Sequence, residues 1–152
     1  YYKVTITGIN DTTVTMDTVW RFLNGTDANS EQTIDIANGL KSDEYGFWAI
    51  YAANLNKGDA LRLKGYDATY VNNTDTFTFT GGVRDRCYWF INNQFTDITD
   101  ETRSTLRYNY LNIFFDRETG MLLSLTNNDY YNNPAREEVI TWTLIDSSVW
   151  DV

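Results

Sequence analysis

The sequence predicts an all-β protein: a single antiparallel curved sheet, forming a half-open barrel or a sandwich of about nine strands. Three observations support this prediction. Apolar and polar residues alternate with a period of two rather than 3.6. Turn signals recur about every ten residues. Thr, Tyr and Asn are abundant, which suits strands and turns, while helix formers such as Ala and Lys are scarce. We therefore expect residues 1–152 to form one β domain.

The first third of the chain contains three predicted strands. Residues 3–7 alternate in polarity, and residues 14–22 place their apolar side chains on one face. Asn24 and Gly25 follow at once and form the strongest short hairpin signal. Residues 33–36 alternate again and end at Asn38-Gly39.

The rest of the chain continues this pattern. We predict strands at residues 61–64, 76–80, 83–91, 108–116, 121–125 and 139–145. Residues 117–120 form a predicted hairpin turn with Gly120 in the left-handed conformation. One segment, residues 97–107, has a helix start signal at Asp100 and Glu101.

Charge and composition exclude several classes of function. The chain has 12 Lys and Arg against 21 Asp and Glu, a net charge of −9, which disfavours nucleic acid and anionic lipid. His is absent, so His-dependent nucleophiles, bases and zinc sites are excluded. One Cys makes neither an internal disulfide nor a thiolate cage. We expect no cofactor, no metal and no membrane span, since no apolar run approaches the ~20 residues required. Because the sequence opens at Tyr1 without an initiator Met, we expect a mature or trimmed fragment.

Carboxylates are the main remaining proton carriers. They cluster at residues 43–44, 97–101 and 137–138, and a glycosidase needs two of them about 5–9.5 Å apart. A solvated acidic loop is the alternative that we favour. Residues 27–31 resemble the start of a calcium loop, but they lack its Gly and its final Glu, so we expect an ordinary polar turn.

Aromatic side chains and the single Cys give further candidates. Tyr88, Trp89 and Phe90 cannot all face one core, and we favour a curved sheet with a core on both sides. The alternatives are outward rings that stack on sugars or that form a subunit contact. Cys87 is predicted to be a buried thiol, with an intermolecular disulfide as the alternative. In a half-open barrel, five apolar side chains would line a ligand groove: Met16, Trp20, Phe22, Phe77 and Phe79.

Three Asn-X-Thr sequons fall at predicted turns, where an attached glycan is accessible. The candidate acceptors are Asn10, Asn24 and Asn72. A chain rich in Asn and Thr also produces such triplets by chance, so the pattern alone does not show that any of the three is glycosylated.

Four segments, taken in order, carry a resemblance to a known family: residues 54–59 (NLNKGD), 79–84 (FTGGVR), 114–122 (FFDRETGML) and 142–150 (WTLIDSSVW). Together they resemble uncharacterised ectodomains of archaeal cell-surface proteins, which are common in methanogens. The resemblance implies a chain placed between a secretion signal and a C-terminal membrane or sorting anchor. Similar turns occur in lipoprotein-carrier folds, whose half-open barrel holds an acyl chain.

The sequence departs from that family in having Phe114 and Phe115 where a Tyr-Trp pair is usual, and in lacking the anchor. The resemblance supplies no catalytic residues. It favours a non-enzymatic, extracellular cell-surface structural protein, a homo-oligomer or partner of other surface proteins that assembles into a coat (S-layer), sheath or filament. The alternatives are a lipid- or glycan-binding half-barrel and, ranked last, a carboxylate glycosidase.

Overall fold

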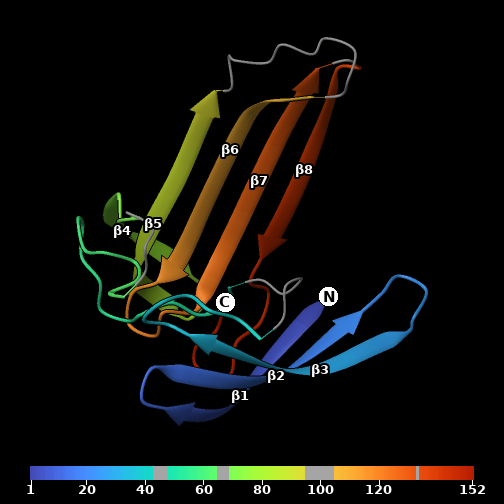
Figure 1. Ribbon diagram of the computed structural model, residues 1–152. Helices are drawn as coiled ribbons and strands as arrows, with labels where there is room; N and C mark the ends of the chain where they lie inside the picture. Colours follow the sequence, from blue (N-terminus) through green and yellow to red (C-terminus); the bar gives the residue numbers. More distant parts are fainter. Residues whose placement is uncertain (43–47, 65–68, 95–104, 133) are drawn as a thin grey trace. The chain divides into compact units, whose positions relative to one another are not determined.

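The computed structural model describes residues 1–42, 48–64, 69–94, 105–132 and 134–152. Within these ranges the chain is all-β and contains no helix, as the period-two pattern predicts (Figure 1). The eight strands are β1 (Tyr2–Asn10), β2 (Thr13–Arg21), β3 (Asp27–Asp35), β4 (Asn73–Phe79), β5 (Gly82–Gln94), β6 (Thr105–Asp116), β7 (Leu122–Asn132) and β8 (Arg136–Thr143).

The strands form two antiparallel sheets rather than the single sheet of nine strands that we predicted. The first sheet has the order β1-β2-β3, and the second has the order β4-β5-β6-β7-β8 (Figure 1). Every neighbour in a sheet is also a neighbour in sequence, so both sheets are meanders and neither is closed. The prediction of an all-β fold is confirmed at this coarser level.

The predicted strand at residues 61–64 is wrong. Its alternation is real, because Leu61 is buried and Leu63 is 81% exposed. However, its backbone bonds to loops: the Leu61 amide donates to the Thr69 carbonyl and the Lys64 amide to the Ala37 carbonyl. A short alternating segment without an adjacent strand partner does not extend a sheet.

The described chain divides into two compact units. The first comprises Tyr1–Ala52 and Ala60–Thr69, and the second comprises Ala53–Asp59 and Tyr70–Val152. The first sheet belongs to the first unit and the second sheet to the second. The prediction that residues 1–152 form one domain stays a prediction.

The first unit buries one face of its sheet beneath the chain that follows β3. Its core consists of Val14, Met16, Ile34 and Ala49, with four half-buried neighbours packed against them: Val4, Ile36, Trp48 and Ile50. The inward face also holds two buried polar residues. The Thr18 and Ser30 hydroxyl oxygens lie 2.8 Å apart, and the Tyr2 hydroxyl donates to Gln32 Oε1 at 3.2 Å. Each of these groups is satisfied, as burial requires.

The second unit has its own core near the β6–β7 turn. The fully or nearly fully buried side chains are Val71, Cys87, Ile113, Phe115, Leu122 and Leu123. Toward their other ends β6 and β7 carry half-exposed residues on both faces. A sheet with two accessible faces offers surface for contact with other molecules.

The predicted hairpin turns are largely confirmed. Gly25 and Gly120 both have positive φ, 83° and 73°, which glycine adopts without steric cost. The polar turn predicted at residues 27–31 is wrong, because these residues begin β3. The predicted helix at residues 97–107 lies mostly outside the described residues, and its last three residues belong to β6.

Candidate functional site

One face of the second sheet carries an aromatic side chain in almost every cross-strand row. Direct pairing places Tyr88 opposite Phe114 and Tyr108 opposite Tyr130. Directly paired residues share a face, as does every second residue along a strand. We call this surface the ring face. Its aromatic members are Phe77, Phe79, Tyr88, Phe90, Tyr108, Tyr110, Phe114 and Tyr130.

At the β4 side of the ring face, several side chains form an ordered stack. The Arg86 guanidinium lies over the Phe77 ring at 4.5 Å and over the Phe114 ring at 4.2 Å. Asp75 holds this guanidinium through two hydrogen bonds, of 2.7 and 3.0 Å. The Tyr88 and Phe114 ring centroids are 5.4 Å apart. These contacts fix the ring positions, so a ligand would meet a preorganised surface.

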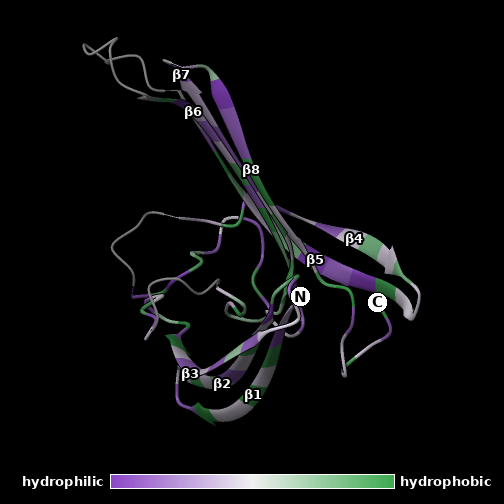
Figure 2. Ribbon diagram, turned by 90° about the vertical axis from the view of Figure 1, so that its right-hand side faces the viewer, coloured by the Kyte–Doolittle hydropathy of each residue, from purple (hydrophilic) through white to green (hydrophobic). Residues whose placement is uncertain are grey.

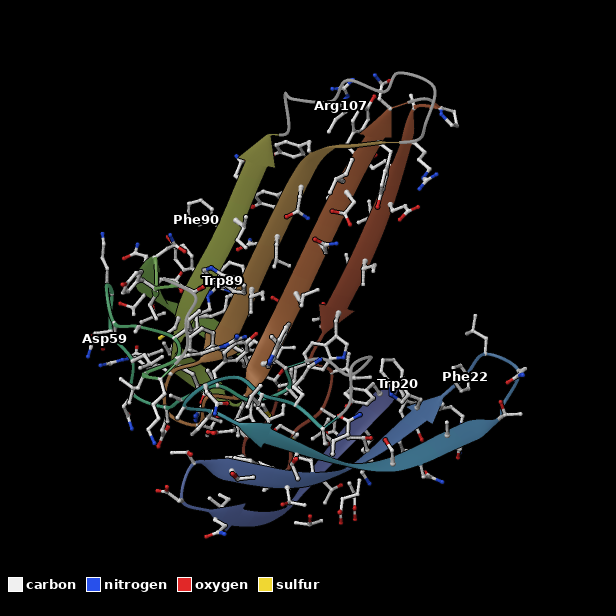
Figure 3. The ribbon with its side chains drawn as sticks, viewed as in Figure 1. Trp20, Phe22, Asp59, Trp89, Phe90 and Arg107 are labelled. Carbon is white, nitrogen blue, oxygen red and sulfur yellow. The ribbon has the colours of Figure 1, made fainter. Side chains whose placement is uncertain are left out.

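Three rings of this face are exposed. Phe77, Phe90 and Tyr130 show 42%, 45% and 45% of their surfaces. Figure 3 labels Phe90 and its neighbour Trp89 on β5; because strand residues alternate, the two belong to opposite faces. Side chains of Asn92, Asn112, Thr126, Asn128 and Thr141 lie between the rings in the same rows. The ring face therefore alternates aromatic surface with hydroxyl and amide groups.

The opposite face of the second sheet is more apolar. Its register brings together Trp89, Ile91, Leu111, Ile113, Leu125, Ile140 and Trp142. Beyond them lies an amide network: Asn109 Nδ2 donates to Asn127 Oδ1 at 3.0 Å and to Asp129 Oδ1 at 2.5 Å. Along β5 the side chains alternate, so Cys87, Trp89 and Ile91 share this face while Tyr88 and Phe90 belong to the ring face.

A second candidate site surrounds the β6–β7 turn. A shallow depression there is lined by Asn54, Val83, Arg84, Asp85, Asp116, Arg117 and Glu118. Asp116 is completely buried and accepts hydrogen bonds from Arg84 Nε at 2.8 Å and Nη2 at 3.0 Å. It also accepts hydrogen bonds from the Thr119 amide at 2.8 Å and the Thr119 hydroxyl at 2.6 Å.

These bonds decide the charge state of Asp116. Burial acts to raise its pKa, but the hydrogen bonds from Arg84 and Thr119 outweigh burial and leave the pKa below its ordinary value. A general acid needs a raised pKa to carry a proton at neutral pH. Asp116 is therefore an anion that fastens the turn, not a proton donor.

The other charged residues of the depression are also tied to neighbours. Glu118 is 77% exposed and binds Arg84 at 2.9 Å. Arg117 donates to the Leu55 carbonyl at 2.9 Å and to Asn56 Oδ1 at 2.6 Å, and it contacts Asp85 at 3.4 Å. The cluster holds the 54–56 loop against the β6–β7 turn.

The predicted carboxylate clusters are only partly visible. Those at residues 43–44 and 97–101 lie outside the described residues. Glu137 and Glu138 lie at the exposed start of β8, where Glu138 pairs with Arg136 at 3.0 Å and Glu137 accepts a hydrogen bond from Asn128. Within the described ranges no three acidic or thiol side chains converge as a metal site would require.

The five predicted groove residues fall in two different sheets. Met16 is fully buried in the first unit, where Trp20 stacks on Tyr2 with ring centroids 4.2 Å apart and Phe22 is 51% exposed. Phe77 and Phe79 belong to β4 in the second unit, with centroids 4.9 Å apart. A groove lined by all five stays a prediction.

Cys87 is fully buried, and its thiol donates to the Leu55 carbonyl at 3.3 Å. Burial raises its pKa to about 11, which keeps the sulfur protonated and unreactive at neutral pH. The intermolecular disulfide stays a prediction.

The candidate sequons occupy different settings. Asn10 is the last residue of β1, Asn24 lies in the loop between β2 and β3, and Asn72 lies just before β4.

From the sequence we identified the aromatic residues of β5 but missed the continuation of the ring face onto β6 and β7. The sequence did contain a signal for this extension. In the strand that leads into the Gly120 turn, the alternation Tyr108-Asn109-Tyr110 places both tyrosines on one face.

Comparison with known proteins places the chain in no family. No family model, curated protein or solved structure matches the chain. Within its described ranges the chain has no helix with the length and apolar character needed to cross a bilayer.

Proposed function

We propose that the protein is a non-enzymatic, extracellular cell-surface protein whose ring face binds a neutral, extended glycan. The observation that carries the proposal is the row of aromatic side chains across β4 to β7, three of them exposed. Sugar rings present C–H groups that stack on aromatic faces, and their hydroxyl groups bond to amides such as those between the rings.

The chemistry of the face favours a glycan over a lipid. An acyl chain needs an enclosed apolar groove, whereas the ring face interleaves its rings with Asn and Thr. Its two Arg residues at the β4 end already pair with Asp75 and Asp116, and the chain carries a net charge of −9. An acidic glycan would be repelled, so we expect a neutral one.

The proposal that the protein is not an enzyme is supported by the β6–β7 depression. Its buried carboxylate is held as an anion by Arg84 and Thr119, which is a structural arrangement. The extracellular, cell-surface location is supported by the composition and by the family resemblance of the four segments.

Binding to soluble neutral polysaccharides, hydroxyethyl cellulose and mannan, tests the proposal by affinity electrophoresis. An aromatic contact contributes about 0.5–1.5 kcal/mol, so Phe90→Ala and Tyr130→Ala are each expected to weaken binding about 2- to 13-fold. Ile140→Ala is the matched control, because Ile140 is 52% exposed and lies on the opposite face. Equal losses in all three variants, or no binding to either polysaccharide, would contradict the proposal.

Self-association through β8 is the second candidate function. β8 is the last strand of its sheet, and all its residues except Trp142 are exposed, including Val139 at 54% and Ile140 at 52%. Figure 2 shows its colour changing from hydrophilic to hydrophobic along the strand. An exposed edge of this kind pairs with a second copy.

Sedimentation velocity over a range of concentrations tests this second function. We expect wild-type protein to form larger species that Thr141→Pro prevents, because Pro removes a backbone donor at the edge. A strict monomer at all concentrations would refute it, and it would leave the glycan proposal unaffected.

A further inference from the structure

Asn24 lies in the tightly closed loop between β2 and β3. The loop is closed by the cross-strand pair Arg21 and Asp27, joined by two side-chain hydrogen bonds. Within the loop, the Phe22 amide donates to the Thr26 carbonyl at 3.0 Å and the Gly25 amide donates to the Phe22 carbonyl at 3.0 Å. The loop is thus ordered by its own bonds.

The side chain of Asn24 adopts an Asx turn with the third residue of its own sequon. Its Oδ1 accepts a hydrogen bond from the Thr26 amide at 3.0 Å and another from the Thr26 hydroxyl at 2.7 Å. The described residues offer the Asn24 Nδ2 group no hydrogen-bond acceptor. The folded loop therefore brings the acceptor amide and the sequon hydroxyl together and leaves the nitrogen accessible.

The surroundings of this loop are open. Leu23 is fully exposed and Phe22 is 51% exposed. Figure 3 shows Phe22 at the end of the hairpin where β2 meets β3. A Cβ built on Gly25 meets no atom within 4 Å. A modifying enzyme would meet no steric obstacle from the hairpin itself.

The sequon at Asn72 has the opposite character. Asn72 Oδ1 accepts a hydrogen bond from the Phe90 amide at 2.9 Å, and the Asn72 amide donates to the Tyr88 carbonyl at 2.9 Å. Its threonine, Thr74, lies in β4 directly opposite Cys87. The sequon is therefore extended along the sheet and tied to β5.

The sequon at Asn10 is also engaged. Asn10 pairs with Thr13 at the end of β1, and Asp11 has a φ of 54°. The Thr12 side chain hydrogen-bonds to Asp35 and helps to lower the pKa of that carboxyl. The sequon hydroxyl is thus committed to another strand.

We propose that Asn24 is the N-glycosylation site of the folded protein. A transferase would move a glycan from a lipid-linked phosphate donor: the bond from sugar C1 to the phosphate oxygen breaks, and a bond from C1 to Asn24 Nδ2 forms. Nδ2 loses one proton to a base of the transferase, and the lipid phosphate leaves. That the chain meets such an enzyme rests on the proposed extracellular location.

The test uses purified folded protein, a single-subunit oligosaccharyltransferase that accepts Asn-X-Thr, and its lipid-linked oligosaccharide. Peptide mapping by mass spectrometry locates the glycan. We expect modification at Asn24 alone in the folded protein. We expect modification at all three sites in protein that is unfolded in urea and diluted directly into the reaction, where transfer competes with refolding. Asn24→Gln should abolish modification of the folded protein, while Asn72→Gln should leave it unchanged.

Two results would overturn the proposal: folded protein modified at Asn10 or Asn72 as readily as at Asn24, or folded protein unmodified at Asn24 when the unfolded chain is modified there. The reaction needs neither secretion nor a ring-face ligand. Its failure is therefore separate from a failure of glycan binding, which the polysaccharide assay measures.

Discussion

Replacing Asp116 with Asn tests what holds the β6–β7 turn, because Asn keeps the size of the side chain and removes its charge. Asp116 is fully buried and accepts two hydrogen bonds from Arg84 and two from Thr119. The substitution deprives the Arg84 guanidinium, with 19% side-chain exposure, of its main counter-charge. Loss of one partner of a buried ion pair costs about 3–5 kcal/mol. Because Glu118 still contacts Arg84, we expect the lower end, about 3 kcal/mol.

Urea unfolding followed by circular dichroism measures this loss. With a slope of about 1–3 kcal/mol per molar urea, the midpoint should fall by about 1–3 M. Glu118→Gln is the matched control: Glu118 binds the same guanidinium at 2.9 Å but is exposed, so we expect a cost below about 1 kcal/mol.

The pH dependence of unfolding separates charge from packing. The pKa of Asp116 is lowered in the folded protein, so its stabilisation is complete above the ordinary value of 3.8 and is lost as the pH falls below it. The Asp116→Asn variant should lack this component. A variant within about 0.5 kcal/mol of wild type, with unchanged acid sensitivity, would refute the buried ion pair as the fastening of the turn.

Two further predictions concern other parts of the molecule. Glu31 lies directly opposite Asp17 across β2 and β3, so Glu31→Lys should stabilise the first unit by about 0.5–1 kcal/mol in urea unfolding. High salt should erase that gain, and a lower midpoint would contradict the like-charge repulsion. The Cys87 thiol, whose pKa burial raises to about 11, should resist iodoacetamide at pH 8 until the protein is unfolded. Labelling of native protein at the rate of a free thiol would show that Cys87 is accessible.

Local pattern was enough to predict most of the secondary structure. Alternation located most of the strands, because a strand that buries one face, such as β2, requires a period of two. For β3 it predicted only residues 33–36, whereas the strand begins at Asp27. Turn glycines were also informative: Gly25 and Gly120 occupy the positive-φ positions that their hairpins require. These features depend on residues close together in the chain.

The division into two sheets was not predictable in the same way. The two sheets separate because the chain after β3 does not add a further strand to the first sheet. In that segment the Leu61 and Lys64 amides donate to loop carbonyls, and not to a neighbouring strand. The segment between β3 and β4 supplies Ala49 and Trp48 to the first core, a role that alternation does not reveal.

The candidate sites show the same limit. Arg84 and Asp116 are 32 residues apart, so their ion pair could not be inferred without the β5–β6 register. Predicting the ring face would have required both the β5–β6 and the β6–β7 register. Only the two together place Tyr88, Tyr110 and Tyr130 on one surface. The choice among the three sequons needed hydrogen-bond geometry, since all three fit the same Asn-X-Thr pattern.

The most direct measurement of the central claim is a chemical-shift titration of labelled protein with a neutral oligosaccharide such as cellohexaose or mannohexaose. We predict that aromatic side-chain signals of Phe90, Tyr110 and Tyr130 shift in a saturable manner, while those of Trp89 and Trp142 on the opposite face stay unchanged. Shifts confined to the opposite face, or the absence of saturable shifts at the ring face with both sugars, would contradict the account.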